Sequence, residues 1–181
     1  MVIVGDNLKQ LVQQYGIIDD INCVEEFSIS LGIDRVIYMP RKAHKDINIE
    51  YDKQNVEKLY KKVIIEDGIV KLKPHSIILA CSCQVVSIPL GYIGFIQTKG
   101  SLARHFVMVH MCDAQIEPGF SGKITFEIVN LSDFTIDIAV NSKVSQLFIH
   151  KCSMVTNNGY SGKYNNSTEP TIPSPHINYF E

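Results

Sequence analysis

Apolar and polar residues alternate along residues 123–130, directly after a turn marked by Pro118, Gly119 and Gly122. The two alternating sets are Ile124, Phe126 and Ile128 on one side, and Lys123, Thr125 and Glu127 on the other. A period of two is typical of a half-buried β-strand. The pattern therefore predicts a strand that is anchored by its apolar face and presents Glu127 on the opposite face. Taken alone, such a glutamate is most often a solvated strand residue.

The second half of the chain continues this β-type pattern. Six segments are rich in Ile, Val and Phe and are separated by Gly, Pro, Asn or Asp; they are Ser76–Ile88, Tyr92–Thr98, His105–Met111, Lys123–Val129, Phe134–Val140 and Lys143–His150. Short strands at intervals of roughly 8–12 residues favour a barrel or sandwich over a parallel α/β sheet. We therefore expect a mainly β fold.

A helical pattern occurs near the start of the chain. Residues 6–16 carry one apolar stripe, which predicts a helix. Asp6 or Asn7 could cap its beginning, and Gly16 is a plausible end.

Three further segments differ in how much they predict. Residues 26–32 alternate and indicate a strand, whereas the lysine-rich segment 39–75 suggests only a short helix around residues 56–60. Residues 157–181 are rich in Asn, Ser, Pro and Gly, and their composition alone indicates a disordered end.

Length and charge limit the classes of protein that need consideration. The 181 residues most readily form one domain, and a net charge of −2 argues against a surface built for nucleic-acid polymers. No apolar run approaches the roughly 20 residues of a membrane span, and the first ten residues lack the pattern of a secretory signal. The five cysteines then suggest reduced thiols and a cytoplasmic protein.

Several common site chemistries find no support in the sequence. The zinc deaminases use an H-x-E and a P-C-x-x-C pattern, and neither occurs here, so we expect no zinc. Cys81-Ser82-Cys83 lies in an apolar run, where alternation would place both thiols on one face as small core residues. Residues 119–124 only superficially resemble a phosphate-binding loop, because the spacing and the Ser or Thr after the lysine are missing.

Two neighbouring segments contain basic residues, a serine, turn glycines and a glutamate, which are residue types suited to binding an anion and transferring a proton. They are residues 94–104, which end in KGSLAR, and residues 115–130, which contain QIEPGFSG and the strand with Glu127. Together they resemble the signature of the dCTP deaminase/dUTPase family, in which RSSLAR is followed by IDPGFSG and LExxN. The resemblance implies a dUTPase-like distorted, jelly-roll-like β-barrel spanning residues 1–181, with a short N-terminal helix. It also implies that residues 157–181 form a flexible C-terminal lid segment.

The resemblance assigns roles to individual residues. Glu127 matches the general acid/base of the deaminase branch, and Arg104 would orient water or stabilise developing charge. The expected substrate-binding residues are Lys99, Gly100, Ser101, Gln115, Glu117, Thr125, Gln146, Tyr160 and Lys163.

The sequence departs from the family pattern at several of these positions. Lys99 replaces an arginine, Gly100 a serine and Glu117 an aspartate, and Ser167 stands where the tail usually has a glutamine. In the early strand, the usual Asp and Arg are replaced by Ser28 and Ser30.

By this resemblance, we expect hydrolytic deamination of dCTP to dUTP, with Mg²⁺ carried by the triphosphate and no metal held by protein side chains. Further cleavage of dUTP to dUMP and pyrophosphate would make the enzyme bifunctional. Two alternatives stay open: a dUTPase alone, and a non-catalytic nucleotide-binding or regulatory protein on the same fold. The family also implies a homotrimer with shared sites and dTTP as a candidate inhibitor, without a nucleic-acid polymer or membrane as partner.

Overall fold

The computed structural model describes residues 1–42, 47–50 and 56–173, and the elements named below lie within them. The helices are α1 (Gly5–Tyr15), α2 (Gly100–Ala103) and two short 3₁₀ turns, η1 (Ile21–Cys23) and η2 (Glu57–Leu59). The strands are β1 (Ile29–Gly32), β2 (Val36–Pro40), β3 (Tyr60–Ile64), β4 (Ile69–Leu72), β5 (Ile77–Cys81), β6 (Val86–Ser87), β7 (Tyr92–Thr98), β8 (Val107–Met108), β9 (Gln115–Ile116), β10 (Ser121–Gly122), β11 (Thr125–Asn130), β12 (Ile136–Ala139) and β13 (Lys143–Lys151).

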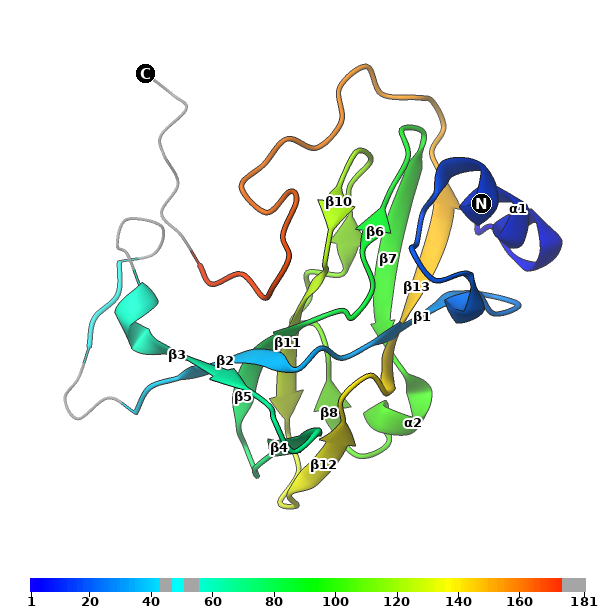
Figure 1. Cartoon of the computed structure of the whole chain (residues 1–181). Coiled ribbons are helices and arrows are strands. Elements are labelled where there is room, and N and C mark those ends of the chain that lie inside the picture. The colour runs from blue at the N-terminus through cyan, green and yellow to red at the C-terminus, as the bar shows by residue number, and fades with distance from the viewer. Residues whose placement is uncertain (43–46, 51–55, 174–181) are drawn as a thin grey trace.

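Two antiparallel sheets form the body of a distorted β-barrel (Figure 1). One sheet has the strand order β1-β13-β7-β9, and the other has the order β3-β2-β5-β11-β8. The short pairs β10-β6 and β12-β4 complete the described sheet structure. The mainly β fold expected from the sequence is therefore confirmed.

The core is formed by the inward-facing residues of both sheets. In β11, Phe126 and Ile128 are fully buried, while Thr125 and Glu127, which alternate with them, stay partly exposed. In the other sheet, Leu147 of β13 is fully buried and is paired with Ile96 of β7. The alternation in the sequence therefore corresponds to the two faces of β11: the apolar residues face the core, and Thr125 and Glu127 lie on the opposite face.

Helix α1 agrees with its prediction except at its start. Leu8, Leu11 and Val12 are buried, and Gly16 ends the helix in the left-handed conformation, with φ of 61°. The expected cap by Asp6 or Asn7 is wrong, because the helix begins at Gly5 after Val4 and has no side-chain cap.

Two predicted strands are shorter than expected. The segment Ser76–Ile88 divides into β5 and β6, with Ser82 between them accepting a hydrogen bond from the Ile124 amide at 2.9 Å. The segment His105–Met111 contributes only β8. Phe106 has φ of 60°, and this left-handed conformation interrupts a strand, so apolar composition alone overestimated its length.

The segment with the weakest sequence signal forms a hairpin. The short helix expected around residues 56–60 is a 3₁₀ turn over Glu57–Leu59, and Tyr60 already begins β3. Strand β3 pairs with β2 along its whole length. The correction is that the short helix gives way to two strands after residue 59, β3 at the edge of the five-stranded sheet and β4 paired with β12.

The tail beyond β13 lies along the barrel over residues 157–173, so a disordered end is wrong for this part (Figure 1). The Tyr160 amide donates to the Pro118 carbonyl at 2.7 Å, and the Asn166 amide donates to the Ser121 carbonyl at 2.6 Å. The tail has few apolar side chains to bury, and backbone hydrogen bonds hold it against the barrel instead. Residues 174–181, the rest of the expected lid segment, lie outside the described residues.

The cysteine-containing turn after β5 packs into the core. Cys81 is fully buried and its burial raises the pKa of its thiol to about 12. Cys83 lies beyond the end of β5, so the two thiols do not share one strand face as predicted.

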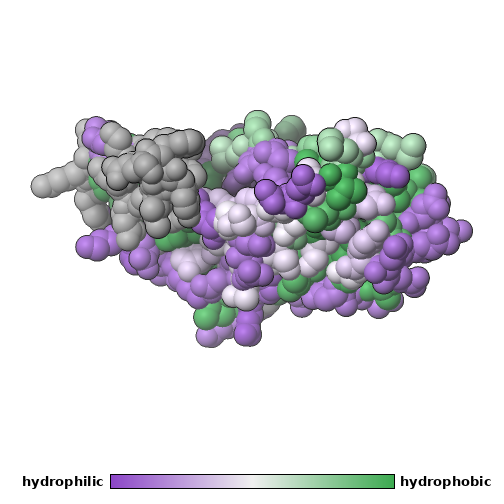
Figure 2. Space-filling model, turned by 90° about the horizontal axis from the view of Figure 1, so that it is seen from above, coloured by the Kyte–Doolittle hydropathy of each residue, from purple (hydrophilic) through white to green (hydrophobic). Residues whose placement is uncertain are grey.

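The face seen in Figure 2 and the helices of the described residues show no large apolar region. On this face, hydrophobic residues are interspersed with hydrophilic ones, as is usual for protein surfaces. Within residues 1–42, 47–50 and 56–173, no helix is both long and apolar enough to cross a bilayer.

Candidate active site

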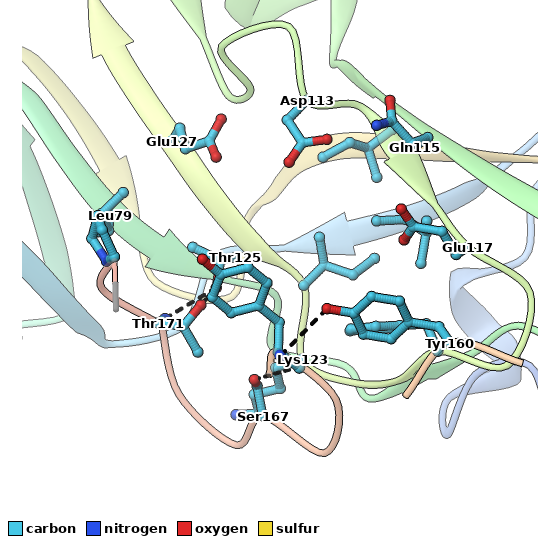
Figure 3. Close-up of a pocket in the computed structure, with 16 residues that line it drawn as sticks. Leu79, Asp113, Gln115, Glu117, Lys123, Thr125, Glu127, Tyr160, Ser167 and Thr171 are labelled. Carbon is cyan, nitrogen blue, oxygen red and sulfur yellow. Dashed lines mark hydrogen bonds between the residues drawn. The ribbon is translucent and has the colours of Figure 1, made fainter. Parts of the chain in front are cut away.

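A cavity of about 440 Å³ lies between β11, the segment around β9 and the C-terminal tail (Figure 3). Five of the residues predicted as site residues line it: Gln115, Glu117, Thr125, Glu127 and Tyr160. These residues come from two strands, a turn and the tail, so the fold gathers positions up to 45 residues apart in sequence. A cavity of this size and mixed polarity is typical of a small-molecule site.

Glu127 is held in place by backbone contacts on β11. Its Oε2 atom accepts a hydrogen bond from the Met111 amide at 2.9 Å, and its own amide donates to the Val109 carbonyl at 3.1 Å. Because one carboxylate oxygen is fixed by Met111, the side chain has a defined orientation at the cavity wall. The other oxygen, Oε1, can interact with a molecule in the cavity.

The tail contributes directly to the cavity wall. The Thr171 amide donates to Thr125 Oγ1 at 3.1 Å, and the two threonine hydroxyls lie 3.0 Å apart (Figure 3). The Tyr160 ring packs against Phe120 with 6.1 Å between ring centroids, and burial raises the pKa of its hydroxyl. The tail therefore covers the same strand face that presents Glu127.

Lys123 is a site residue that the sequence did not reveal. It lines the cavity and forms an ion pair with Asp34, and both side chains are about four-fifths buried. Burial lowers the pKa of Lys123, but the hydrogen bond and charge of Asp34 outweigh it, so the pKa is raised above its ordinary value. The lysine charge is thus already neutralised by a protein partner.

Asp113 is a second wall residue that the sequence analysis missed. Its carboxylate lies on the same side of the cavity as Glu127, and Glu117 lines the cavity as well (Figure 3). Among the cavity-lining residues in the described ranges, these three acids face a single cation, the paired Lys123. The wall is therefore acidic, which disfavours a polyphosphate and favours a group that donates hydrogen bonds. No motif marked Asp113; its only sequence signal is its place two residues before Gln115.

The remaining predicted residues of the KGSLAR segment lie away from this cavity. Lys99, Gly100, Ser101 and Arg104 belong to α2 or flank it, beside β8 (Figure 1). Arg104 is exposed, and its Nη1 atom donates to the Gly100 carbonyl at 3.1 Å. None of these residues lines the cavity. One copy of the chain therefore does not bring together Arg104 and Glu127.

Gln146 and Lys163 also lie outside the cavity lining. Gln146 is on β13, where its Nε2 atom donates to Ser28 Oγ at 3.1 Å. The buried Ser30 donates to Glu25 Oε1 at 2.6 Å. The serines that replace the usual Asp and Arg are therefore both engaged in hydrogen bonds with side chains of the same chain. Lys163 lies over the Tyr164 ring, 5.1 Å from its centroid.

In the part of the chain that the structure describes, no three His, Cys, Asp or Glu residues are grouped so that they could hold a metal ion. Cavity carboxylates such as Glu117 can still contact a cation that arrives with a phosphate ligand.

A family model described as dCTP deaminase-like matches residues 2–152. The chain belongs to this dCTP deaminase-like family. The match includes Arg104, Glu127 and Gln146 but ends before the tail residues Tyr160 and Lys163. The family resemblance inferred from the sequence is confirmed.

Curated relatives of this dCTP deaminase-like chain carry deaminase names. The "dCTP deaminase, dUMP-forming" of Kocuria rhizophila is 28% identical over 161 residues, which cover 86% of this chain and 83% of the relative. The "dCTP deaminase" of Buchnera aphidicola is 26% identical over 141 residues, covering 72% and 73% of the two chains.

A solved structure supports the fold of this dCTP deaminase-like chain. The 2'-deoxycytidine 5'-triphosphate deaminase of Agrobacterium tumefaciens matches with a TM-score of 0.74 and 16% sequence identity. The match covers 85% of this chain but 49% of that protein, so this chain spans about half of its length.

Proposed function

We propose that this protein hydrolyses dCTP to dUTP and ammonia, with Glu127 as the general acid and base. The observation that carries the proposal is the position of Glu127 on the cavity wall, with one carboxylate oxygen held by the Met111 amide. A fixed carboxylate that can reach both a water molecule and a ring nitrogen is suited to repeated proton transfer. Membership of the dCTP deaminase-like family supports the choice of reaction.

In the proposed reaction, water loses a proton to Glu127 while its oxygen forms a bond to C4 of cytosine. Glu127 passes that proton to ring N3, which gives a tetrahedral carbon that carries a hydroxyl and an amine. The hydroxyl proton then moves through Glu127 to the amine, the C4–N4 bond breaks, and ammonia leaves. The carbonyl of uracil forms in the same step, so dCTP and water become dUTP and ammonia.

A second copy of the chain completes the proposed site. The acidic wall suits the amine-bearing base, whereas the triphosphate needs cations. If α2 of a neighbouring copy lay at the open side of the cavity, Lys99 would supply positive charge, and the Ser101 hydroxyl and the Gly100 backbone would donate hydrogen bonds to the phosphates. Gln146 and Lys163 are proposed to contribute further phosphate contacts.

An apolar surface beside α2 suits this assembly. Phe106, Leu131 and Phe134 are 61%, 56% and 67% exposed, and the Leu131 amide donates to the Phe106 carbonyl at 2.9 Å. They lie next to β8, the edge strand of its sheet. Large apolar side chains at a sheet edge are typical of an interface between subunits. We propose the homotrimer of the family, with this edge in the contact.

Mg²⁺ is proposed to bind through the triphosphate oxygens, where it would neutralise phosphate charge. The protein's part is then limited to the cavity carboxylates, and Glu117 is the candidate for contact with the hydrated ion. Arg104 would orient the attacking water or stabilise charge that develops during attack.

A second step, hydrolysis of dUTP to dUMP and pyrophosphate, is favoured by the names of the relatives that form dUMP. Glu117 lines the cavity and is the candidate residue to activate water for that step. As a glutamate in place of the usual aspartate, it is one methylene longer, which shifts the position of its carboxylate relative to the nucleotide.

The deciding experiment is incubation of the purified protein with dCTP and Mg²⁺, followed by separation of the nucleotides. Accumulated dUTP supports deamination alone, and dUMP with pyrophosphate supports both steps. Adding dTTP to the same assay tests inhibition. If dCTP is unchanged while separately added dUTP is cleaved, deamination is refuted in favour of a dUTPase. No reaction with either nucleotide would favour a binding or regulatory role.

A further inference from the structure

The C-terminal tail is fastened at Glu169 to the hairpin of β2 and β3. Glu169 forms an ion pair with Lys62 through Oε2, and the Tyr38 hydroxyl donates to Oε1 at 3.4 Å. Both carboxylate oxygens therefore have a partner on the hairpin. The hydrogen bond with Glu169 raises the pKa of Lys62, while burial, followed by the charge of Glu169, raises that of Tyr38. We call these three side chains the clasp.

The clasp shares a sheet face with the proposed catalytic residue. Strand register places Glu127 opposite Leu79, Leu79 opposite Tyr38, and Tyr38 opposite Lys62. Directly opposed residues of neighbouring strands point to the same face of a sheet. One row of side chains thus runs from Glu127 on β11 to Lys62 on β3, a width of about 14 Å at the usual strand spacing.

The tail lies across this face between two points of attachment. Glu169 is held at β2 and β3, Pro170 is buried, and Thr171 is bonded to Thr125 on β11. Thr171 and Thr125 both line the cavity. Because only Pro170 separates Glu169 from Thr171, the clasp limits where Thr171 can lie.

We propose that Glu169 is a positioning residue, which docks the tail through Lys62 and Tyr38 and so completes the cavity wall beside Glu127. This role rests on the proposed function, because the completed wall is the one that would hold dCTP. This docking gives a role to the β2–β3 hairpin, whose sequence has the least recognisable pattern. The tail must also release its hold when nucleotides enter and leave.

The strength of the clasp is compatible with such opening. The Lys62 and Glu169 side chains are 43% and 42% exposed, and exposed ion pairs stabilise only weakly. Loss of the pair should shift the closed fraction of the tail by about fivefold rather than by orders of magnitude. Salt should weaken the clasp, because the pair is open to solvent.

A charge exchange tests the proposal. The variants are Lys62→Glu, Glu169→Lys and the double exchange, with Lys61→Glu as control, because Lys61 is exposed and precedes Lys62 on the same strand. Hydrogen exchange measures the tail at the Thr171 amide, and steady-state kinetics measure kcat and KM for dCTP. Each single change should accelerate Thr171 exchange and raise KM by about fivefold, with kcat changed less than twofold. The double exchange should recover both values, and Lys61→Glu should alter neither.

Two results would overturn the proposal. Thr171 exchange that is unchanged in both single variants would show that the clasp does not dock the tail. Faster exchange without a rise in KM would show that docking does not position substrate. The thermal unfolding midpoint of each variant verifies that the barrel is intact. If the wild-type protein turns over neither nucleotide, the proposed function fails, while the exchange measurement still decides whether the clasp docks the tail.

Discussion

The cavity wall and the α2 segment differ in charge and surroundings, although both carry residues of the proposed site. The wall presents Glu127 on a strand anchored in the core. Among the described residues that line the cavity, the one cation is Lys123, which is paired with Asp34. The α2 segment presents Arg104 on an exposed turn, where its guanidinium donates a hydrogen bond to the Gly100 carbonyl. In the proposed site, the wall would receive the base, and the α2 segment of a neighbouring copy would lie near the phosphates and the attacking water. The comparison teaches that a single copy of the chain holds both kinds of residue without uniting them.

The largest expected effect comes from the wall. Glu127→Gln should lower kcat for dCTP by about a thousandfold, because the amide cannot take up a proton from water. The glutamine oxygen can still accept from the Met111 amide, so the nucleotide affinity measured by calorimetry should stay nearly unchanged. Glu66→Gln, at an exposed loop position, is the control. Retained turnover in Glu127→Gln would remove this residue from the mechanism.

A change in the other region should have the next largest effect and tests whether the two regions meet between copies. Arg104→Ala should lower kcat/KM by about a hundredfold. Co-assembly of Arg104→Ala with Glu127→Gln should restore activity, because about a quarter of the sites in random closed trimers combine both intact residues. Mixtures that are no more active than the separate variants would place the whole site within one copy.

The attachment of the tail to the wall can be broken at a glycine. Gly119 has φ of 88°, and a Cβ there would lie 2.6 Å from Gly159 Cα and 2.8 Å from the Tyr160 nitrogen. Gly119→Ala should therefore lower the free energy of unfolding by about 2 kcal/mol or displace the tail. Gly16→Ala is the matched control, because Gly16 has φ of 61° but open space around it. Denaturant unfolding of both variants separates backbone strain from the clash, and equal losses would contradict a close tail contact.

The sequence predicted β11 well because its alternation reflects burial directly. It predicted the region around β8 poorly, because the left-handed conformation of Phe106, directly before β8, leaves no mark in a pattern of hydrophobicity. The tail was misjudged for a related reason, since backbone hydrogen bonds such as that of Tyr160 do not depend on side-chain type.

In the candidate site, too, residues with a local sequence motif were predicted, and residues brought together only by the fold were not. Residues within a motif, such as Glu117 and Glu127, were found because their neighbours in sequence carry the signal. Asp34 and Lys123 are 89 residues apart, and only the folded sheets bring their charges together. Asp113 follows no motif, and its importance arises from the cavity that other segments form around it.

Asp113 gives a smaller expected effect than Glu127 or Arg104, and a more specific one. The structure gives its carboxylate no hydrogen-bond or ion-pair partner within the described residues, so it can accept from a ligand. Cytosine carries an amine donor at C4, whereas uracil carries an acceptor oxygen there. Asp113→Ala should therefore lower kcat/KM for dCTP by about tenfold, which corresponds to one hydrogen bond, and should not weaken binding of dUTP.

A second variant separates the carboxylate's charge from its shape. Asp113→Asn keeps the size of the side chain, but its amide can present either an acceptor or a donor to the base. It should therefore lose less activity with dCTP than the alanine variant, and dUTP should bind more tightly than to the wild type. Equal losses for dCTP and dUTP in both variants would mean that Asp113 shapes the wall without reading the base. A selective loss for dCTP would instead show that the acidic wall recognises the amine at C4 of cytosine.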